Sequence, residues 1–238
     1  LRNLPNANIF LFSLDASYLE DSWLIRFGLA ERVTIIDVKN THLQEIVLEL
    51  EKTRKRIEVI FSLKPYFLEF ILGYTQNHDY LVYFDADIFF YNNKIENLMK
   101  DEPELIVFQH QFSKRNEKFN LSGTYNAGLV VFKNSLSGRK LIGKWKNLCY
   151  QQCKVELKGK NHADQGYLEI LVEEEKNTYI VSDLQFNQST WALPIQFNHI
   201  KQYLNPSIYH FHGFRVRNSF FITNLNRSEE HTSELQSR

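Results

Sequence analysis

Short apolar runs alternate with amphipathic stretches along most of the chain. Polar and apolar residues do not alternate within the apolar runs, which is typical of strands buried on both faces of a sheet. We predict strands at residues 8–14, 33–38, 80–84, 105–108, 129–132, 178–181 and 208–211. Helical spacing of apolar residues predicts helices at 18–27, 42–51, 61–74, 137–153 and 164–172.

This alternation of strands and helices predicts a single α/β domain. We expect a mixed, mostly parallel sheet flanked by helices. The length of 238 residues suits one domain, and the sequence contains no internal repeat or low-complexity segment.

Composition and charge exclude several classes of protein. Aromatic residues make up 14% of the chain, which argues against disorder. The 28 basic residues balance 28 acidic ones, so we expect no nucleic-acid partner. Two cysteines can form neither a disulfide scaffold nor a four-cysteine zinc site. No apolar run of about 18 residues and no signal peptide is visible, so we expect no transmembrane segment and a cytoplasmic protein.

The last twelve residues, 227–238, form a polar tail with one isolated leucine. A widely used short-read sequencing adapter translates to residues 227–237 without a mismatch. We interpret 227–238 as a non-native, disordered tail and expect the folded domain to span residues 1–226.

Two aspartates, Asp85 and Asp87, follow the predicted strand 80–84 directly. On an extended backbone, residues two apart point to the same side, and open α/β sheets bind ligands at such strand ends. Two close carboxylates repel unless a cation neutralises them. The pair therefore favours a divalent ion with oxygen ligands that can also hold a diphosphate.

This segment resembles the DxD motif of GT-A-fold glycosyltransferases, which use nucleotide-sugar donors. Further motifs at residues 62–66, 124–128, 163–168 and 209–213 have the order and spacing of the glycosyltransferase family 8-like branch. They resemble more closely a bacterial family of nucleotide-diphospho-sugar transferases. The resemblance covers residues 8–215 and implies transfer of a sugar, with retention of its configuration, to a saccharide or glycolipid acceptor. A role in cell-surface polysaccharide synthesis is implied in the same way.

The resemblance also implies a metal site. Asp85 and Asp87 would bind Mn²⁺ or Mg²⁺ on the donor diphosphate, and His210 would complete the site. An imidazole ligand favours Mn²⁺. His212 is a rival ligand, because it shares a strand face with His210 by spacing; otherwise we expect it, with Gly213, at the substrate.

The remaining motifs imply substrate-binding and catalytic residues. Lys64 precedes Pro65 near the predicted start of a helix, where an anion such as phosphate is favoured. Asn126 and Gly128 suggest a close approach of backbone to ligand and an amide that bonds sugar hydroxyls. The resemblance places Asp164 and Gln165 beside the reacting sugar carbon, as the candidate catalytic residues. Without it, Asp164 would be an ordinary helix N-cap.

The chain departs from the resembled pattern in two places. GT-A folds open with a strand that begins the nucleotide pocket, and here the match begins at the second strand. Because of this and of the adapter-like tail, we expect the domain to be truncated at both ends and the chain as written to be a poor or inactive enzyme. In addition, Arg215 or Arg217 stands where the family has a lysine after its histidine–glycine motif.

Two other functions remain open on the sequence alone. A phosphohydrolase of the haloacid-dehalogenase type also has Asp-x-Asp after an apolar strand. A non-catalytic carbohydrate-binding fragment is the third alternative.

Overall fold

The structure, a computed structural model, describes residues 3–15, 25, 28, 30–75, 79–113, 123–156, 159–189, 191–192, 205–212, 215–217 and 220–222. The strands in this part of the chain are β1 (Ile9–Ser13), β2 (Val33–Asp37), β3 (Tyr80–Phe84), β4 (Ile88–Phe90), β5 (Leu105–Gln109), β6 (Tyr125–Lys133), β7 (Thr178–Val181), β8 (Gln188–Ser189), β9 (Ile208–His210), β10 (Arg215–Arg217) and β11 (Phe220–Ile222). The α-helices are α2 (Leu43–Glu51), α3 (Arg56–Ile71), α4 (Leu136–Gln151) and α5 (Gly166–Glu174).

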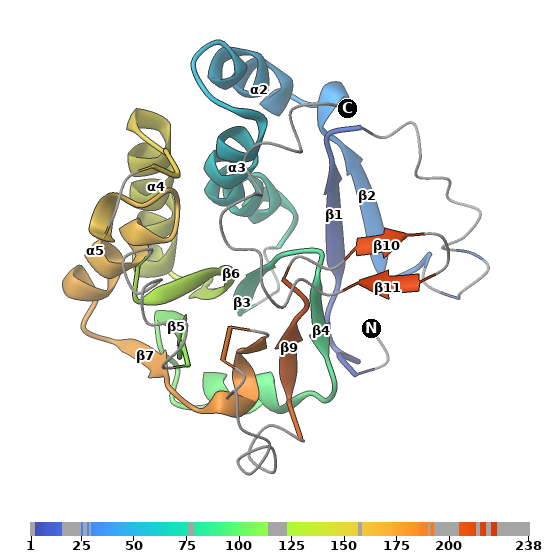
Figure 1. The fold of residues 1–238 in the computed structure, drawn as a ribbon, viewed down its shortest axis with the longest axis vertical. Coiled ribbons are helices and arrows are strands. Elements are labelled where there is room, and N and C mark those ends of the chain that lie inside the picture. The colour runs from blue at the N-terminus through green and yellow to red at the C-terminus, as the bar shows by residue number, and fades with distance from the viewer. Residues whose placement is uncertain are drawn as a thin grey trace.

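The central sheet has the strand order β3-β6-β5-β7 (Figure 1). Strand β6 runs antiparallel to both β3 and β5, and β7 runs parallel to β5. Successive residues of β5 face opposite cores: Leu105 and Val107 belong to one hydrophobic cluster, whereas Ile106 and Phe108 belong to another. Burial on both faces explains why these strands read as continuous apolar runs.

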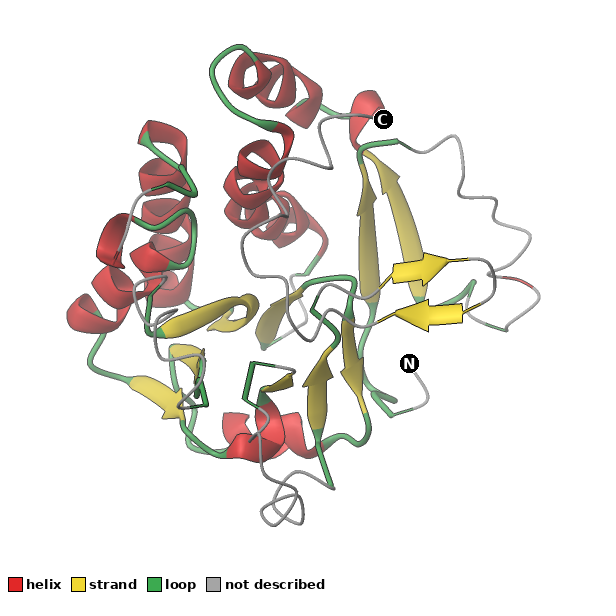
Figure 2. Ribbon diagram, viewed as in Figure 1, coloured by secondary structure: helices red, strands yellow, loops and turns green. Residues whose placement is uncertain are grey.

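Helices α3, α4 and α5 gather on one side of the central sheet (Figure 2). Trp145 of α4 and Leu168 of α5 are fully buried, and both pack in the cluster that contains Val107 and Phe132 of the sheet. Removing these apolar side chains from water is what stabilises the layer. Within the described residues, no helix combines the length and hydrophobicity that crossing a bilayer requires.

Two smaller sheets accompany the central sheet. Strands β1 and β2 form a parallel pair, and Phe12 of β1 stacks on Phe67 of α3 with ring centroids 4.3 Å apart. Strand β9 lies beside β4, to which it is antiparallel (Figure 1), and pairs on its other edge with β8, to which it is parallel. This second sheet joins the segment after β3 to residues about 120 positions later in the chain.

The predicted elements largely match the observed ones. Strands occur at each predicted run, and the predicted helices at 42–51, 137–153 and 164–172 correspond to α2, α4 and α5. Of the predicted helix 18–27, only Ile25 is among the described residues, and the tail 227–238 lies outside them. The expected missing strand before Leu1 stays a prediction.

Two expectations about the fold are wrong. The sheet is mixed but not mostly parallel, since four of the seven strand pairings in the described residues are antiparallel. An apolar run reveals burial on both faces but carries no information about strand direction.

The second error concerns the start of α3. The helix begins at Arg56, where the Lys55 backbone N–H donates to Glu58 Oε2 at 3.0 Å and is capped by it. Lys64 and Pro65 therefore lie inside the helix and not at its first turn. The helix tolerates Pro65 within a buried face, although proline removes one backbone hydrogen bond.

Candidate active site

Two strand pairings assemble the candidate site. The Asp85 backbone N–H donates to Gly128 O at 2.8 Å, extending the β3–β6 ladder. In the second sheet Ile88 pairs with His210, and the Phe211 N–H donates to Asp87 O at 2.8 Å. The aspartates that follow β3 are thus brought beside the glycine of β6 and the histidine of β9.

Asp87, His210 and His212 form a compact group of possible metal ligands. Asp87 Oδ1 lies 3.0 Å from His210 Nε2, and one ligand atom from each of the three residues lies within 4.8 Å of the others. Burial would raise the pKa of Asp87, but the bond from His210 and the proximity of both histidines lower it below its ordinary value. A carboxylate with two imidazoles suits a divalent ion such as Mn²⁺.

Asp85 lies next to this group with partners of its own. Its Oδ1 accepts a 2.7 Å hydrogen bond from the Tyr83 hydroxyl and lies 3.3 Å from Lys64 Nζ. A Cβ placed on Gly128 would be 2.8 Å from both Asp85 Oδ2 and His210 Cε1. Only a glycine at this position lets the carboxylate and the imidazole come so close.

A network of amides fixes the orientation of the His210 ring. The Gly128 N–H donates to Asn126 Oδ1 at 2.8 Å, so the Asn126 amide nitrogen faces Asn187 Oδ1 at 2.9 Å and His210 Nδ1 at 3.1 Å. Asn187 is oriented in turn, because its Nδ2 donates to Gln109 O at 2.8 Å. The Asn126 amide thus holds His210 at Nδ1, and the other ring nitrogen, Nε2, faces Asp87.

Asn126 is thus engaged inside the protein. It is 3% exposed, and both amide hydrogens are directed to Asn187 and His210. Its expected contact with sugar hydroxyls stays a prediction.

Lys64 joins Asp85 to Asp164 in the interior. Its Nζ lies 2.9 Å from Asp164 Oδ2, and the side chains of both residues are 3% exposed. Burial alone would lower the pKa of Lys64, but the two carboxylates outweigh burial and raise it. Burial raises the pKa of Asp164, although the Lys64 ammonium acts in the opposite direction.

The backbone around Asp164 is held in an unusual conformation. Ala163 has a φ of +47°, which is uncommon for a residue with a side chain. The Trp145 indole N–H donates to Asp164 O at 2.9 Å. Gln165 is the N-cap residue of α5 and makes no side-chain capping bond. The N-cap alternative for Asp164 is therefore wrong, because its carboxylate faces Lys64 instead.

Several residues beside the site were not identified from the sequence. The Trp191 ring lies 5.1 Å from the His210 ring and 5.4 Å from the His212 ring, between centroids. His110 is buried against Trp191, and burial lowers its pKa to about 3. Of these residues, only Tyr83 could have been identified from the sequence, because a residue two positions before Asp85 on an extended strand points to the same side.

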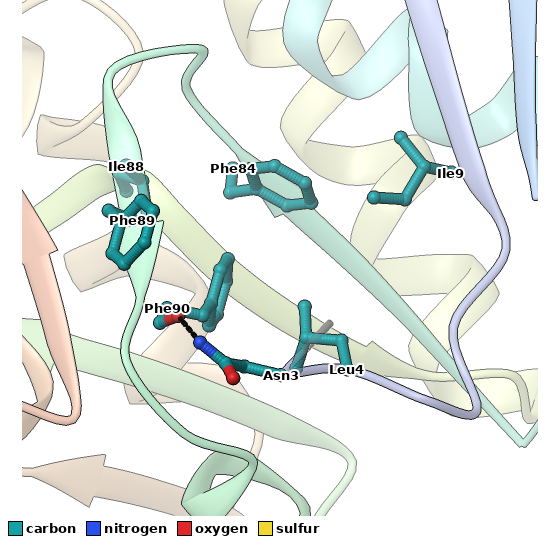
Figure 3. Close-up of a pocket in the computed structure, with 7 residues that line it drawn as sticks. All are labelled: Asn3, Leu4, Ile9, Phe84, Ile88, Phe89 and Phe90. Atoms are coloured by element: carbon teal, nitrogen blue, oxygen red, sulfur yellow. Dashed lines mark hydrogen bonds between the residues drawn. The ribbon is translucent and has the colours of Figure 1, made fainter. Parts of the chain in front are cut away.

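A cavity of about 300 Å³ lies on the other side of β3. Figure 3 shows its lining, which is apolar apart from Asn3: Asn3, Leu4, Ile9, Phe84, Ile88, Phe89 and Phe90. Asn3 Nδ2 donates to Phe90 O at 2.7 Å. None of the predicted site residues lines this cavity, so it is not the candidate active site.

The structure therefore brings together most of the predicted site residues. Asp85, Asp87, Gly128, His210 and His212 meet directly, while Lys64, Asn126 and Asp164 reach them through the bonds above. Gln165 is half-buried next to Asp164. Gly213 lies outside the described residues, as do the side chains of Arg215 and Arg217.

Comparison with known proteins gives relatives of undetermined function. The chain is 26% identical over 155 residues to the uncharacterized protein YfnF of Bacillus subtilis, covering 62% of this chain and 51% of YfnF. It is 25% identical over 197 residues to the uncharacterized protein YfnD of the same organism, covering 78% of this chain and 63% of YfnD. The chain thus spans between half and two thirds of each relative. No family model matches it.

A solved structure identifies the fold. A glycosyltransferase involved in the glycosylation of the major capsid of PBCV-1 superposes with a TM-score of 0.50, at 9% identity, over 88% of this chain and 94% of that chain. This likeness does not favour the phosphohydrolase alternative. The chain has a mixed α/β, GT-A-like glycosyltransferase fold.

Proposed function

We propose that the chain transfers a sugar from a nucleoside-diphosphate donor to a saccharide or glycolipid acceptor, with the help of a divalent cation. The observation that carries this proposal is the group formed by Asp87, His210 and His212 beside Asp85, at the end of β3. The fold supports it, because open α/β sheets bind ligands at such strand ends.

The charges of the site support a divalent ion in particular. Asp85, Asp87 and Asp164 supply three carboxylates, and Lys64 supplies one ammonium, which leaves a formal charge of −2. One divalent cation would balance this charge. The two imidazoles favour Mn²⁺ over Mg²⁺, whose preference for oxygen ligands is stronger. When bound, the ion would stabilise the charge that develops on the departing nucleoside diphosphate.

The chain's own residues have distinct roles in this proposal. Asp85, Asp87 and His210 hold the ion, and His212 either joins them or contacts the substrate. Asn126 and Gly128 position His210, through one hydrogen bond and through close packing respectively. Asp164 supplies negative charge near the sugar, where positive charge develops in the transition state. We propose retention of configuration only because the resemblance of the sequence motifs to family 8-like enzymes implies it.

The test is donor turnover. The chain is incubated with a panel of nucleotide sugars and either Mn²⁺ or EDTA, and released nucleoside diphosphate is quantified. We expect release that depends on Mn²⁺ and that an Asp87→Ala variant lacks. Donor is used at high concentration, so that weak binding does not hide turnover. Release of phosphate from simple phosphomonoesters, with no release from nucleotide sugars, would favour the phosphohydrolase instead.

A further inference from the structure

Lys64 is a cation enclosed between two candidate site carboxylates. Its Nζ lies 3.3 Å from Asp85 Oδ1 and 2.9 Å from Asp164 Oδ2, and it donates to Ala127 O at 3.2 Å. The Ala127 carbonyl accepts a hydrogen bond from the ammonium, and the two carboxylates are its ion-pair partners. The side chain is only 3% exposed.

Aromatic rings enclose the same ammonium. Its Nζ lies 5.0 Å from the centroid of the Phe61 ring and 5.2 Å from that of the Tyr83 ring. Both distances are within the range of favourable cation–π contact. The hydroxyl of Tyr83 also donates to Asp85 Oδ1, so the ring and the carboxylate are held together.

A direct phosphate contact would disrupt this arrangement. To reach a phosphate, Lys64 Nζ would have to move away from at least one of these three oxygens. If it moved away from Asp164, a carboxylate that is 3% exposed would be left without its counter-ion. Leaving one partner of a buried ion pair uncompensated is strongly unfavourable.

We propose that Lys64 is a positioning residue, which bridges Asp85 and Asp164 and fixes the two carboxylates relative to each other. The bridge ties the end of β3 and the segment before α5 to the middle of α3. If the proposed function is right, it also fixes the place where the diphosphate is held relative to the place where the sugar reacts. That last consequence rests on the proposed function, whereas the bridge itself does not.

Charge balance gives the first test. We expect Lys64→Met to lower the Tm of the metal-free chain by roughly 6–20 °C, because it leaves a buried carboxylate unpaired. Adding Asp164→Asn removes that charge, so the double variant should recover most of the loss. Lys146→Met is the matched control: Lys146 pairs with Glu69 at 2.7 Å and lies over the Tyr66 ring, but near the surface. Its effect should not exceed about 4 °C.

The result that would overturn the bridge is equally definite. If Lys64 only contacted phosphate, Lys64→Met would leave the Tm unchanged in the absence of donor. Adding Asp164→Asn would then not raise the Tm of that variant. If Lys64→Met does not fold, recovery of folded protein in the double variant supports the bridge, and failure of both variants to fold refutes it.

Mn²⁺ affinity distinguishes a Lys64 that holds Asp85 in place from a Lys64 that only balances its charge. Asp164→Asn and the double variant differ only at residue 64, and both are titrated with Mn²⁺ while free Mn²⁺ is followed by electron paramagnetic resonance. Loss of a nearby positive charge would by itself tighten Mn²⁺ binding. Positioning predicts the opposite, about tenfold weaker binding in the double variant, because Asp85 loses an anchor. Equal or tighter binding would refute positioning. If the unmodified chain binds no Mn²⁺, the proposed metal site fails, while the Tm measurements still decide the bridge.

Discussion

Gly128→Ala is the substitution that most directly tests the packing of the candidate site. Residue 128 lies in β6, where its missing side chain leaves room for three site residues. An added Cβ would lie 2.8 Å from Asp85 Oδ2, 2.8 Å from His210 Cε1 and 3.0 Å from Asn126 Oδ1. The alanine methyl group therefore meets the ends of side chains that belong to the site, and not a rigid part of the core.

The size of the effect follows from these distances. Comfortable contacts with carbon begin near about 3.5 Å, so each neighbour has to retreat by roughly 0.5–0.7 Å. Ligand distances in metal sites are held to within about 0.2 Å. We expect the displaced Asp85 and His210 to bind Mn²⁺ about 10–100-fold more weakly. Overpacking costs about 1–3 kcal/mol, and the low end applies here because flexible side-chain ends can yield.

Mn²⁺ titration and thermal unfolding measure the two effects separately. Gly143→Ala is the matched control, because nothing lies within 4 Å of a Cβ on Gly143 in the interior of α4. That substitution should stabilise the helix by about 0.5–1 kcal/mol and leave Mn²⁺ affinity unchanged. Unchanged Mn²⁺ affinity in Gly128→Ala would show that Asp85 and His210 do not form the ion-binding group.

Three further predictions concern individual side chains. Asp85→Ala or Asp87→Ala should abolish Mn²⁺-dependent donor binding while circular dichroism shows the fold intact; donor binding that persists unchanged in both would contradict this. His210→Ala should weaken Mn²⁺ binding, followed by calorimetry, more than His212→Ala, because His210 is buried against Asp87 and His212 is exposed; a larger loss at 212 would reverse the assignment. His110 should make stability depend on acid: burial lowers its pKa from 6.5 to about 3, so the unfolded chain binds the proton first as pH falls. The stabilisation is complete above pH 6.5 and about 2 kcal/mol of it is lost by pH 5, so urea unfolding of His110→Gln should show a shallower loss between these pH values.

The sequence predicted the strands well because their burial on both faces leaves continuous apolar runs. Strand direction was not predictable in this way, because β6 reads the same whether it runs parallel or antiparallel to β3 and β5. The start of α3 was misplaced because Pro65 looked like a first-turn residue. The Glu58 carboxylate, which accepts from the Lys55 N–H, marks the true start at Arg56.

The sequence identified most residues of the candidate site, but not the contacts between them. The spacing of Asp85 and Asp87 after a strand indicated their shared chemistry. No spacing could show that Lys64 would lie between Asp85 and Asp164, since that bridge depends on the packing of α3 against the sheet. Asn187 and Trp191 likewise reach the site only through tertiary structure, and neither belongs to a recognisable motif.

The central claim is that a divalent ion at Asp87 and His210 holds a nucleoside diphosphate. Equilibrium binding of a panel of nucleoside diphosphates, with Mn²⁺ and with EDTA, tests it most directly in the unmodified chain and in Asp87→Ala. Metal contact with the diphosphate predicts at least one nucleotide whose affinity rises about tenfold or more with Mn²⁺, and no such rise in the variant. Affinities that are the same with Mn²⁺ and with EDTA, or an equal rise in Asp87→Ala, would contradict the claim.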